Sequence, residues 1–347
     1  MSDDSKFSKN FLWGASTSAH QVEGNNHNDW SEWEKENAKR LSRESGGKYP
    51  PKNYISGEAC DHYHRYEEDF DIAKSLGHNA HRFSIEWSRV EPEEGKFDEK
   101  EIEHYHNVIK ALRERDMEPF VSLWHWTLPL WLRDKGGVES KEFPHLFTRY
   151  AERMAHEFQN DVRFWITLNE TNVYLGMGYW RGVWPPGVRS LVRYLTANHH
   201  LSIAHKRAYA AIKQIQPDVH IGIAHNCIYF SKNPLKSFVW NRLFLHSIRN
   251  NQDFIGVNYY HSDRTTERRS EFLNWSIDPE GLYHVLLGLR KFQKPIYITE
   301  NGLADAEDKH RAWFIKGHVR WMKKAMDEGA DVRGYFYWSL LDNFEWD

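Results

Sequence analysis

Eight short segments rich in β-branched and aromatic residues recur along the chain, and longer stretches with helical spacing separate them. Several of these segments are apolar without interruption, which is typical of strands in a parallel sheet that is covered on both faces. We therefore predict eight strands, at residues 11–17, 80–87, 118–126, 163–170, 220–226, 253–260, 294–301 and 332–341.

The stretches between the predicted strands carry apolar residues at steps of three and four, which is the spacing of one helix face. Gly77 follows one such stretch as a stop signal, and Asp98 with Glu101 has the spacing of a capping box that opens another. The apolar faces are expected at Tyr63, Tyr66, Phe70, Ala73 and Leu76; at Ile102, Tyr105, Ile109 and Leu112; and at Trp313, Gly317, Trp321 and Ala325.

Strand and helix alternate through the whole chain, without a low-complexity linker or an internal repeat. Eight such units predict an α/β fold, a (β/α)₈ TIM barrel, formed as a single catalytic domain by residues 1–347. The Gly- and Pro-rich stretch 45–57 is then expected to be a loop of the first connection and not a domain boundary.

Composition narrows the class of protein further. The formal net charge of −3 gives no reason to expect a nucleic-acid or acidic-membrane partner. Two cysteines, Cys60 and Cys227, are no disulfide framework. We see neither a signal peptide nor a run of roughly 18 apolar residues, so we expect a soluble cytoplasmic protein that does not insert into a membrane. The 16 tryptophans fit either a large core or a site that stacks on sugar rings.

Polar and ionisable residues gather where the predicted strands end, which in this fold is the face that carries the active site. Such residues are costly at a barrel mouth unless they are paired or functional. They are Gln21, Arg82, His125, Trp126, Asn169, Glu170, Asn258, Tyr260, Glu300, Asn301, Trp338, Glu345 and Trp346.

Two glutamates stand out in this set. Glu170 in "ITLNE" and Glu300 in "YITEN" each end a strongly apolar strand, and the two strands lie three apart in order. Hydrolysis of a glycosidic bond uses such a pair, with one carboxyl as the proton donor and the other as the nucleophile. The charge on one carboxylate also disfavours ionisation of the other, which keeps one of them protonated.

Seven segments of the chain resemble the signature segments of glycoside hydrolase family 1, the retaining β-glucosidase/β-galactosidase family. They are "FLWGASTSAHQVEG", "HRFSIEWSRV", "LWHWTLPLWL", "TLNE", "DFIGVNYY", "ITENG" and "WSLLDNFEW", in the family's order. The resemblance implies hydrolysis of unphosphorylated β-glucosides or oligosaccharides by double displacement, without a metal or an organic cofactor.

The same resemblance implies a role for each site residue. Glu170 is expected to be the general acid/base and Glu300 the nucleophile, which Arg82 and Tyr260 support. Asn169 is expected to bind the sugar 2-OH, and Glu345 to disfavour 6-phosphorylated sugars. The remaining substrate-binding positions are Gln21, His125, Trp126, Asn258, Trp338 and Trp346.

The chain departs from the family pattern at three places. Thr171 stands where the family usually has proline, so the loop that aims Glu170 is expected to be less rigid. Residues 227–252 replace a longer insertion with a single helix around "LKSFVWNRLFLHSI", which predicts an open aglycone side. After strand 8 no covering helix follows, so Tyr335 and Tyr337 are expected to be partly bare. Either the polypeptide continues past Asp347, or a homo-oligomer or another covering chain closes the seam.

Two alternatives remain open at this point. A transglycosylase would use the same residues, and a degenerate, non-catalytic sugar-binding barrel would typically lose one carboxylate. The 21 histidines could in principle hold a metal, but pairs such as His62 and His64 fall on different helix faces and no zinc spacing occurs. The sequence does not separate gluco from galacto or fuco configuration.

Overall fold

The eight strands form a closed barrel in which each strand runs parallel to its sequence neighbours and the last pairs with the first. The computed structural model describes residues 7–271 and 273–346. All eight predicted strands are confirmed. They are β1 (Leu12–Ser16), β2 (Ala80–Ser84), β3 (Glu118–Ser122), β4 (Phe164–Asn169), β5 (His220–Tyr229), β6 (Phe254–Ser262), β7 (Ile296–Asn301) and β8 (Val332–Trp338).

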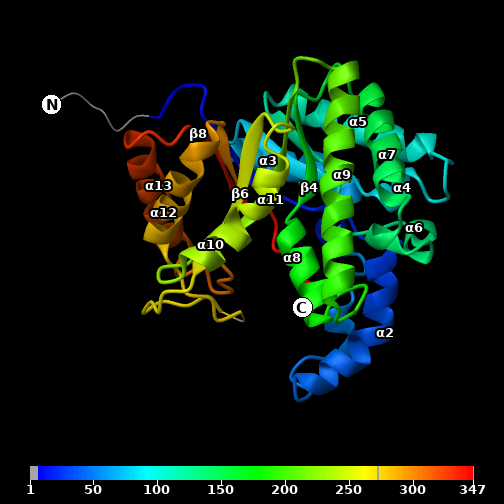
Figure 1. Ribbon diagram of the computed structural model, residues 1–347, viewed down its shortest axis with the longest axis horizontal. Helices are drawn as coiled ribbons and strands as arrows, with labels where there is room; N and C mark the ends of the chain where they lie inside the picture. The colour runs from blue at the N-terminus through cyan, green and yellow to red at the C-terminus, as the bar shows by residue number, and fades with distance from the viewer. Residues whose placement is uncertain (1–6, 272, 347) are drawn as a thin grey trace.

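Helices occupy the connections and surround the barrel, with α7 and α9 on one side and α12 and α13 on the other (Figure 1). The longer ones are α2 (Asp29–Glu44), α3 (His62–Ser75), α5 (Glu99–Glu114), α7 (Phe143–Glu157), α9 (Leu191–Ile215), α12 (Pro279–Leu289) and α13 (Arg311–Asp327). The shorter ones are α1 (Ala19–Val22), α4 (Trp87–Val90), α6 (Leu130–Asp134), α8 (Thr171–Leu175), α10 (Pro234–Asn241) and α11 (Leu243–Ser247). Single turns are η1 (Pro51–Tyr54), η2 (Gly137–Glu139), η3 (Gly176–Arg181) and η4 (Arg290–Phe292).

An aromatic layer fills the part of the barrel interior that is nearer the starts of the strands. The ring of Phe120 stacks on Phe164 at 4.2 Å between centroids and lies 4.8 Å from Phe336 and 5.2 Å from Tyr297. This cluster is separate from the larger core between barrel and helices. It gives the barrel a solid floor, as expected for this fold.

The inward positions become polar two residues further along the strands, because side chains of a strand alternate between its two faces. Arg82 follows Ala80, Ser122 follows Phe120 and Asn226 follows Ala224. The pairing register shifts between Ile166 and Asn169, and again between Val257 and Asn258. Such irregularities re-aim side chains at barrel rims, and here they accompany the polar layer above the aromatic floor.

The predicted loop 45–57 lies between α2 and α3 and contains only the turn η1. Asp98 caps α5, since its side chain accepts from the backbone N–H groups of Lys100 and Glu101. The predicted capping box is only half formed, because the backbone N–H of Asp98 donates to the Val90 carbonyl and not to Glu101. Two predicted helix faces are partly wrong. Leu76 follows the last residue of α3 and is 67% exposed. The buried face of α13 contains Phe314 and His318, whereas Trp313 is exposed.

The segment that was expected to form one helix contains two, α10 and α11, with a break at Arg242. Arg242 leaves the helical conformation at φ −133°. The preceding Asn241 is buried, and its side chain accepts from the backbone N–H of Ile228 and donates to the Ile228 carbonyl. These two bonds tie the end of α10 to β5 and override the helical spacing of the sequence.

The outer side of β8 is better covered than expected. Within the described chain a loop, residues 339–346, follows β8. Tyr335 is nevertheless buried, because Trp13 lies 6.1 Å from its ring and Phe7 and Phe11 pack on Trp13. The prediction that Tyr335 is partly bare is therefore wrong, while Tyr337 is half-buried. Association of chains at this seam stays a prediction. Among the described residues no helix is long and apolar enough to span a bilayer.

Candidate active site

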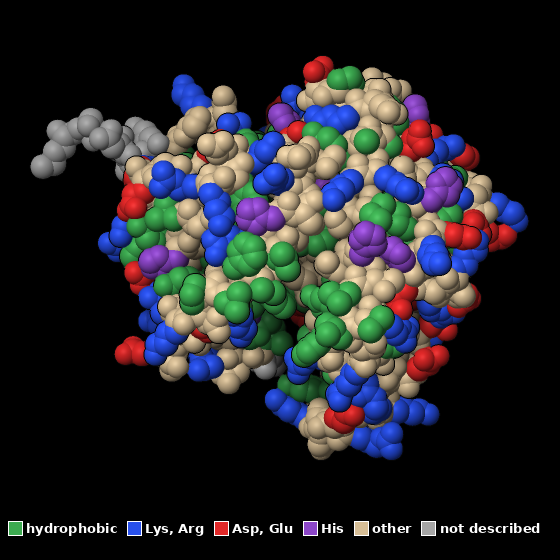
Figure 2. Space-filling view, in the orientation of Figure 1, with side chains coloured by type: hydrophobic (Ala, Val, Ile, Leu, Met, Phe, Trp, Pro, Cys, Tyr) green, Lys and Arg blue, Asp and Glu red, His purple; other side chains and the backbone are tan. Residues whose placement is uncertain are grey.

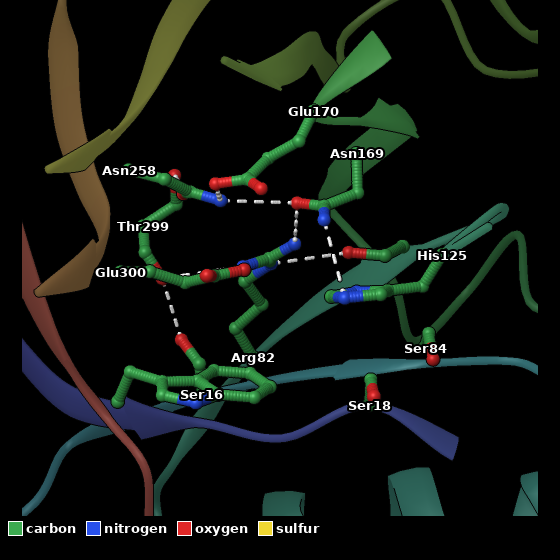
Figure 3. A network of polar contacts seen from close by, with 12 residues as sticks. Ser16, Ser18, Arg82, Ser84, His125, Asn169, Glu170, Asn258, Thr299 and Glu300 are labelled. Atoms are coloured by element: carbon green, nitrogen blue, oxygen red, sulfur yellow. Dashed lines mark hydrogen bonds and ion pairs between the residues drawn. The ribbon is translucent and has the colours of Figure 1, made fainter. Parts of the chain in front are cut away.

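The side chains of four strands meet over the aromatic floor of the barrel. Arg82 comes from β2, Asn169 and Glu170 from the end of β4, Asn258 from β6 and Glu300 from β7 (Figure 3). All five are buried. A continuous series of contacts joins the two glutamates, from Glu170 through Asn258, Asn169 and Arg82 to Glu300. The structure thus brings together the residues that the sequence scattered over more than 200 positions.

Glu300 lies between a guanidinium and a phenol. Its Oε1 accepts from Arg82 Nη1, and its Oε2 accepts from the Tyr260 hydroxyl at 2.6 Å. Arg82 is itself fixed, because its Nη2 donates to Asn169 Oδ1 at 2.7 Å and its Nε donates to Ser122 Oγ at 3.2 Å. One cation and one hydroxyl therefore donate to the two oxygens of the Glu300 carboxyl group.

Glu170 has a different environment. Its backbone adopts the left-handed conformation, with φ 43° and ψ 53°, between β4 and α8. Its Oε1 accepts from Asn258 Nδ2 at 2.9 Å and from Asn226 Nδ2 at 3.1 Å. Burial raises the pKa of Glu170 from its ordinary 4.5 to about 8, and the charge of Glu300 adds to this, against the opposing amide bonds and Arg82. Glu170 is therefore a neutral proton donor near neutral pH.

Thr171 follows Glu170 where a proline was expected. Its hydroxyl is buried, and its Oγ1 has no hydrogen-bond partner among the described residues. The backbone N–H groups of Val173 and Tyr174 both donate to the Glu170 carbonyl at 3.0 Å, which continues the chain into α8. The aim of the Glu170 side chain thus comes from the amides of two other strands and not from a proline in its own loop.

His125 and Trp126 follow β3, and both contact Asn169. The Asn169 amide donates to His125 Nε2 at 3.2 Å, and Trp126 Nε1 donates to the Asn169 carbonyl at 3.0 Å. Burial lowers the pKa of His125 well below its usual range, and Arg82 lowers it further. The imidazole is therefore neutral, and its buried Nδ1 has no partner within the described chain.

The end of β8 and the loop after it form the wall next to His125 and Trp126. Trp338 is half-buried, and its Nε1 donates to Glu345 Oε1 at 3.2 Å. Trp346 is buried and stacks on His20 at 5.2 Å, and it lies 5.0 Å from Trp126. Gln21 fastens this loop, since its Nε2 donates to Asn343 Oδ1 and to the Phe344 carbonyl. All predicted substrate-binding positions thus border one mouth.

Two polar residues of the site were missed in the sequence. Asn226 ends the predicted fifth strand and contacts Glu170, and the same search of strand ends that found the others would have found it. Thr299 precedes Glu300, and its Oγ1 donates to Asn258 Oδ1 at 2.6 Å. Its role depends on a tertiary contact that no local pattern shows. The described residues contain no group of three side chains arranged to hold a metal ion.

Known proteins share the sequence pattern and the fold of this chain. The sequence model of glycosyl hydrolase family 1 matches residues 3–243 and 267–347. Beta-glucosidase A of Thermotoga maritima is 33% identical over 410 aligned positions, which cover 98% of this chain and 90% of that protein. Because 410 positions exceed the 347 residues of this chain, the relative carries segments that this chain lacks.

Solved structures show the same fold. A beta-glycosidase from Pyrococcus horikoshii superposes with a TM-score of 0.88 at 35% identity, over 98% of this chain and 87% of that one. The beta-glucosidase from Thermotoga maritima in complex with deoxynojirimycin has a TM-score of 0.86 at 31% identity, over 98% and 91%. The chain therefore belongs to glycosyl hydrolase family 1 and is a β-glycosidase.

Proposed function

We propose that the enzyme hydrolyses unphosphorylated β-glucosides and related β-glycosides with retention of configuration, with Glu300 as nucleophile and Glu170 as acid/base. One observation carries this assignment. The two carboxyl groups of the same mouth lie in opposite environments, since Glu300 faces a guanidinium and a phenol while burial keeps Glu170 neutral. An ionised nucleophile beside a protonated acid is the starting state of a double displacement.

In the first step a Glu300 oxygen attacks the anomeric carbon and the bond from that carbon to the leaving oxygen breaks. Glu170 gives its proton to the leaving oxygen, so the aglycone departs as a neutral alcohol. In the second step water attacks the anomeric carbon, its proton returns to Glu170, and the ester bond to Glu300 breaks. Two inversions at the same carbon give net retention.

The electrostatics support the change of role between the two steps. Part of the raised pKa of Glu170 is due to the negative charge of Glu300. That charge disappears when Glu300 becomes esterified to the sugar, so the pKa of Glu170 falls and the carboxyl group can act as a base. The donors on Oε1, Asn226 and Asn258, stabilise the carboxylate that remains after proton transfer.

The walls of the mouth suggest how the sugar is held. Asn169, next to Glu170, is expected to meet the 2-OH, and His125 offers its Nδ1–H to a further hydroxyl. Trp338 is expected to cover the apolar face of the ring, with Glu345, Trp346, Trp126 and Gln21 around the far hydroxyls. The carboxylate of Glu345 would repel a phosphate there, which favours unphosphorylated sugars.

The aglycone side is expected to be open and apolar. Figure 2 shows a hollow between the surface over α10 and the surface over α8, with hydrophobic side chains on both sides. Exposed apolar residues in the flanking elements are Leu235 and Val239 of α10 and Trp180 of η3. Such a rim contacts many aglycones without selecting one shape, so weak leaving-group selectivity is expected.

A panel of aryl β-glycosides tests the proposal, with the anomeric configuration of the first product followed by NMR. We expect hydrolysis of aryl β-glucosides and the β-anomer as the first product. Glu300→Gln should abolish turnover, while Glu103→Gln on the exposed face of α5 should not change it. Activity of Glu300→Gln, or an α-anomer as first product, would show that the assigned mechanism is wrong. A strong preference for one aglycone shape would contradict the open aglycone side.

A further inference from the structure

The short segment between β5 and β6 reaches the proposed acid/base through two hydrogen bonds. Trp240, near the end of α10, donates from its Nε1 to Asn226 Oδ1 at 3.1 Å. Asn226, in β5, donates from its Nδ2 to Glu170 Oε1 at 3.1 Å. Trp240 thus stands one side chain away from Glu170, although 70 positions separate them in the sequence.

The indole fixes which way the Asn226 amide faces. An indole N–H only donates, so the amide atom that it meets must be the carbonyl oxygen. The NH₂ group of Asn226 then faces Glu170. In the reversed orientation the NH₂ group would meet the indole N–H, donor against donor, and the amide oxygen would face the Glu170 carboxyl. Trp240 therefore disfavours the reversed amide.

The second amide on Glu170 is held in the same way. Asn258 Oδ1 accepts from the Thr299 hydroxyl at 2.6 Å, which directs its Nδ2 to Glu170 Oε1 at 2.9 Å. Oε1 thus receives two N–H donors and has no room for a proton of its own. The proton of the neutral acid must lie on Oε2, which makes no hydrogen bond to the described residues.

Trp240 is itself anchored through its backbone. Its carbonyl accepts from His225 Nε2 at 2.9 Å and from Asn172 Nδ2 at 3.4 Å. Burial lowers the pKa of His225 to about 4, so this imidazole is neutral and donates from Nε2. Asn172 also donates to the Asn226 carbonyl at 2.9 Å. These bonds join α8, β5 and α10 around the acid/base.

We propose that Trp240 is a positioning residue for the acid/base: through Asn226 it keeps two donors on Glu170 Oε1 and thereby holds the transferable proton on Oε2. The inference rests on the proposed role of Glu170. It gives the shortened β5–β6 segment a role in catalysis, because α10 supplies the indole that orients one of the two donors on the acid/base.

Other groups around Glu170 do not replace this contact. The charged groups that face it are Glu300 from β7 and Arg82 from β2. Tyr260 from β6 and Cys227 from β5 are also close enough to feel its charge. Burial raises the pKa of the Cys227 thiol, so Cys227 stays neutral. None of these four groups makes a hydrogen bond to Glu170 within the described chain.

Trp240→Phe removes the indole N–H and keeps an aromatic ring. The Asn226 amide is then no longer held in one orientation, so its NH₂ group faces the carboxylate of Glu170 only part of the time. We expect the basic limb of kcat/KM on phenyl β-glucoside to move up by about half a pH unit to one pH unit. We expect kcat/KM at neutral pH to fall about 3- to 10-fold on this poor leaving group and less than about 2-fold on 2,4-dinitrophenyl β-glucoside, which departs without a proton. Trp313→Phe on α13 is the matched control and should leave both profiles unchanged.

A double-mutant cycle tests the route. Asn226→Ala alone should raise the basic limb in the same way, and Trp240→Phe should add nothing in that background. An unmoved basic limb in either single variant, an equal loss on both leaving groups, or a further shift in the Asn226→Ala background would overturn the proposal. If Trp240→Phe does not fold, the basic limb measured for Asn226→Ala still shows whether the Asn226 donor on Glu170 controls the pH profile. The kinetics of Glu170→Ala on the same two substrates test the proposed role of Glu170 separately. If kcat/KM falls as much on dinitrophenyl β-glucoside as on phenyl β-glucoside, Glu170 is not the acid.

Discussion

Replacing Glu170 with glutamine is expected to stabilise the protein, and to do so increasingly as the pH rises. The fold raises the pKa of this carboxyl from 4.5 to about 8, chiefly by burial. Below about pH 4.5 both the folded and the unfolded chain carry the proton, so ionisation costs nothing. Between about pH 4.5 and about pH 8 the unfolded chain releases the proton while the folded protein retains it, and stability falls as the pH rises.

The gap between 4.5 and about 8, at about 1.4 kcal/mol per pH unit, sets an upper limit of about 5 kcal/mol on this cost. Between about pH 5 and about pH 8, wild type should lose about 3 kcal/mol of unfolding free energy that Glu170→Gln does not lose. The glutamine has nearly the same shape as the neutral acid, and its amide oxygen can still accept from Asn226 and Asn258.

Chemical denaturation at a series of pH values measures this difference directly. Glu103→Gln, on the exposed face of α5, is the control, and its stability should run parallel to wild type. If the difference between Glu170→Gln and wild type is the same at about pH 5 and about pH 8, then Glu170 does not carry a raised pKa. The electrostatic argument for its role as the acid would then fail.

Three further predictions concern Tyr260, Arg82 and Glu170. Tyr260→Phe removes the hydroxyl that donates to Glu300 at 2.6 Å, and steady-state kinetics should show kcat reduced about 10- to 100-fold, the effect of one charged hydrogen bond; an unchanged kcat would refute it. Arg82→Lys cannot reproduce the contacts to Glu300, Asn169 and Ser122, so denaturation should show a loss of about 3–5 kcal/mol together with inactivity; wild-type stability would refute it. Glu170→Ala with 2,4-dinitrophenyl β-glucoside should be accelerated by azide and release the β-glycosyl azide, as seen by NMR; an α-azide or no acceleration would refute it.

The barrel could be predicted from the sequence because its signals are local. Continuous apolar runs mark strands that are buried on both faces, and all eight were found within a few residues of their bounds. The site followed from one geometric rule, that parallel strands of a barrel end on the same face. That rule collected Arg82, Asn169, Glu170 and Glu300 before any contact between them was known.

The misses have a common cause, which is that tertiary contacts override local pattern. Asn241 breaks the predicted helix by bonding to the backbone of β5. In α13 apolar residues occur on two adjacent faces, and packing buries Phe314 where spacing favoured Trp313. Tyr335 is buried by residues near the start of the chain. No window of neighbouring residues contains that information.

Asn226 and Trp240 show the same limit within the site. Asn226 stands at a strand end, so the rule that polar residues at strand ends form the site could have predicted it. The same rule could not have predicted its partner Trp240. The indole contributes only because α10 turns back onto β5, where bonds from His225 and Asn172 hold its backbone. A tryptophan on a short helix carries no sequence signal for such a role.

Mass spectrometry of a trapped glycosyl-enzyme tests the central claim most directly. A 2-deoxy-2-fluoro-β-glucoside with a dinitrophenyl leaving group should form the ester with the nucleophile and then hydrolyse slowly, because the fluorine destabilises the oxocarbenium-like transition state. The account predicts one added 2-fluoroglucosyl mass per chain, on the peptide that contains Glu300, and none in Glu300→Gln. A label on any other residue, or turnover without a covalent species, would contradict the assignment of Glu300 as the nucleophile.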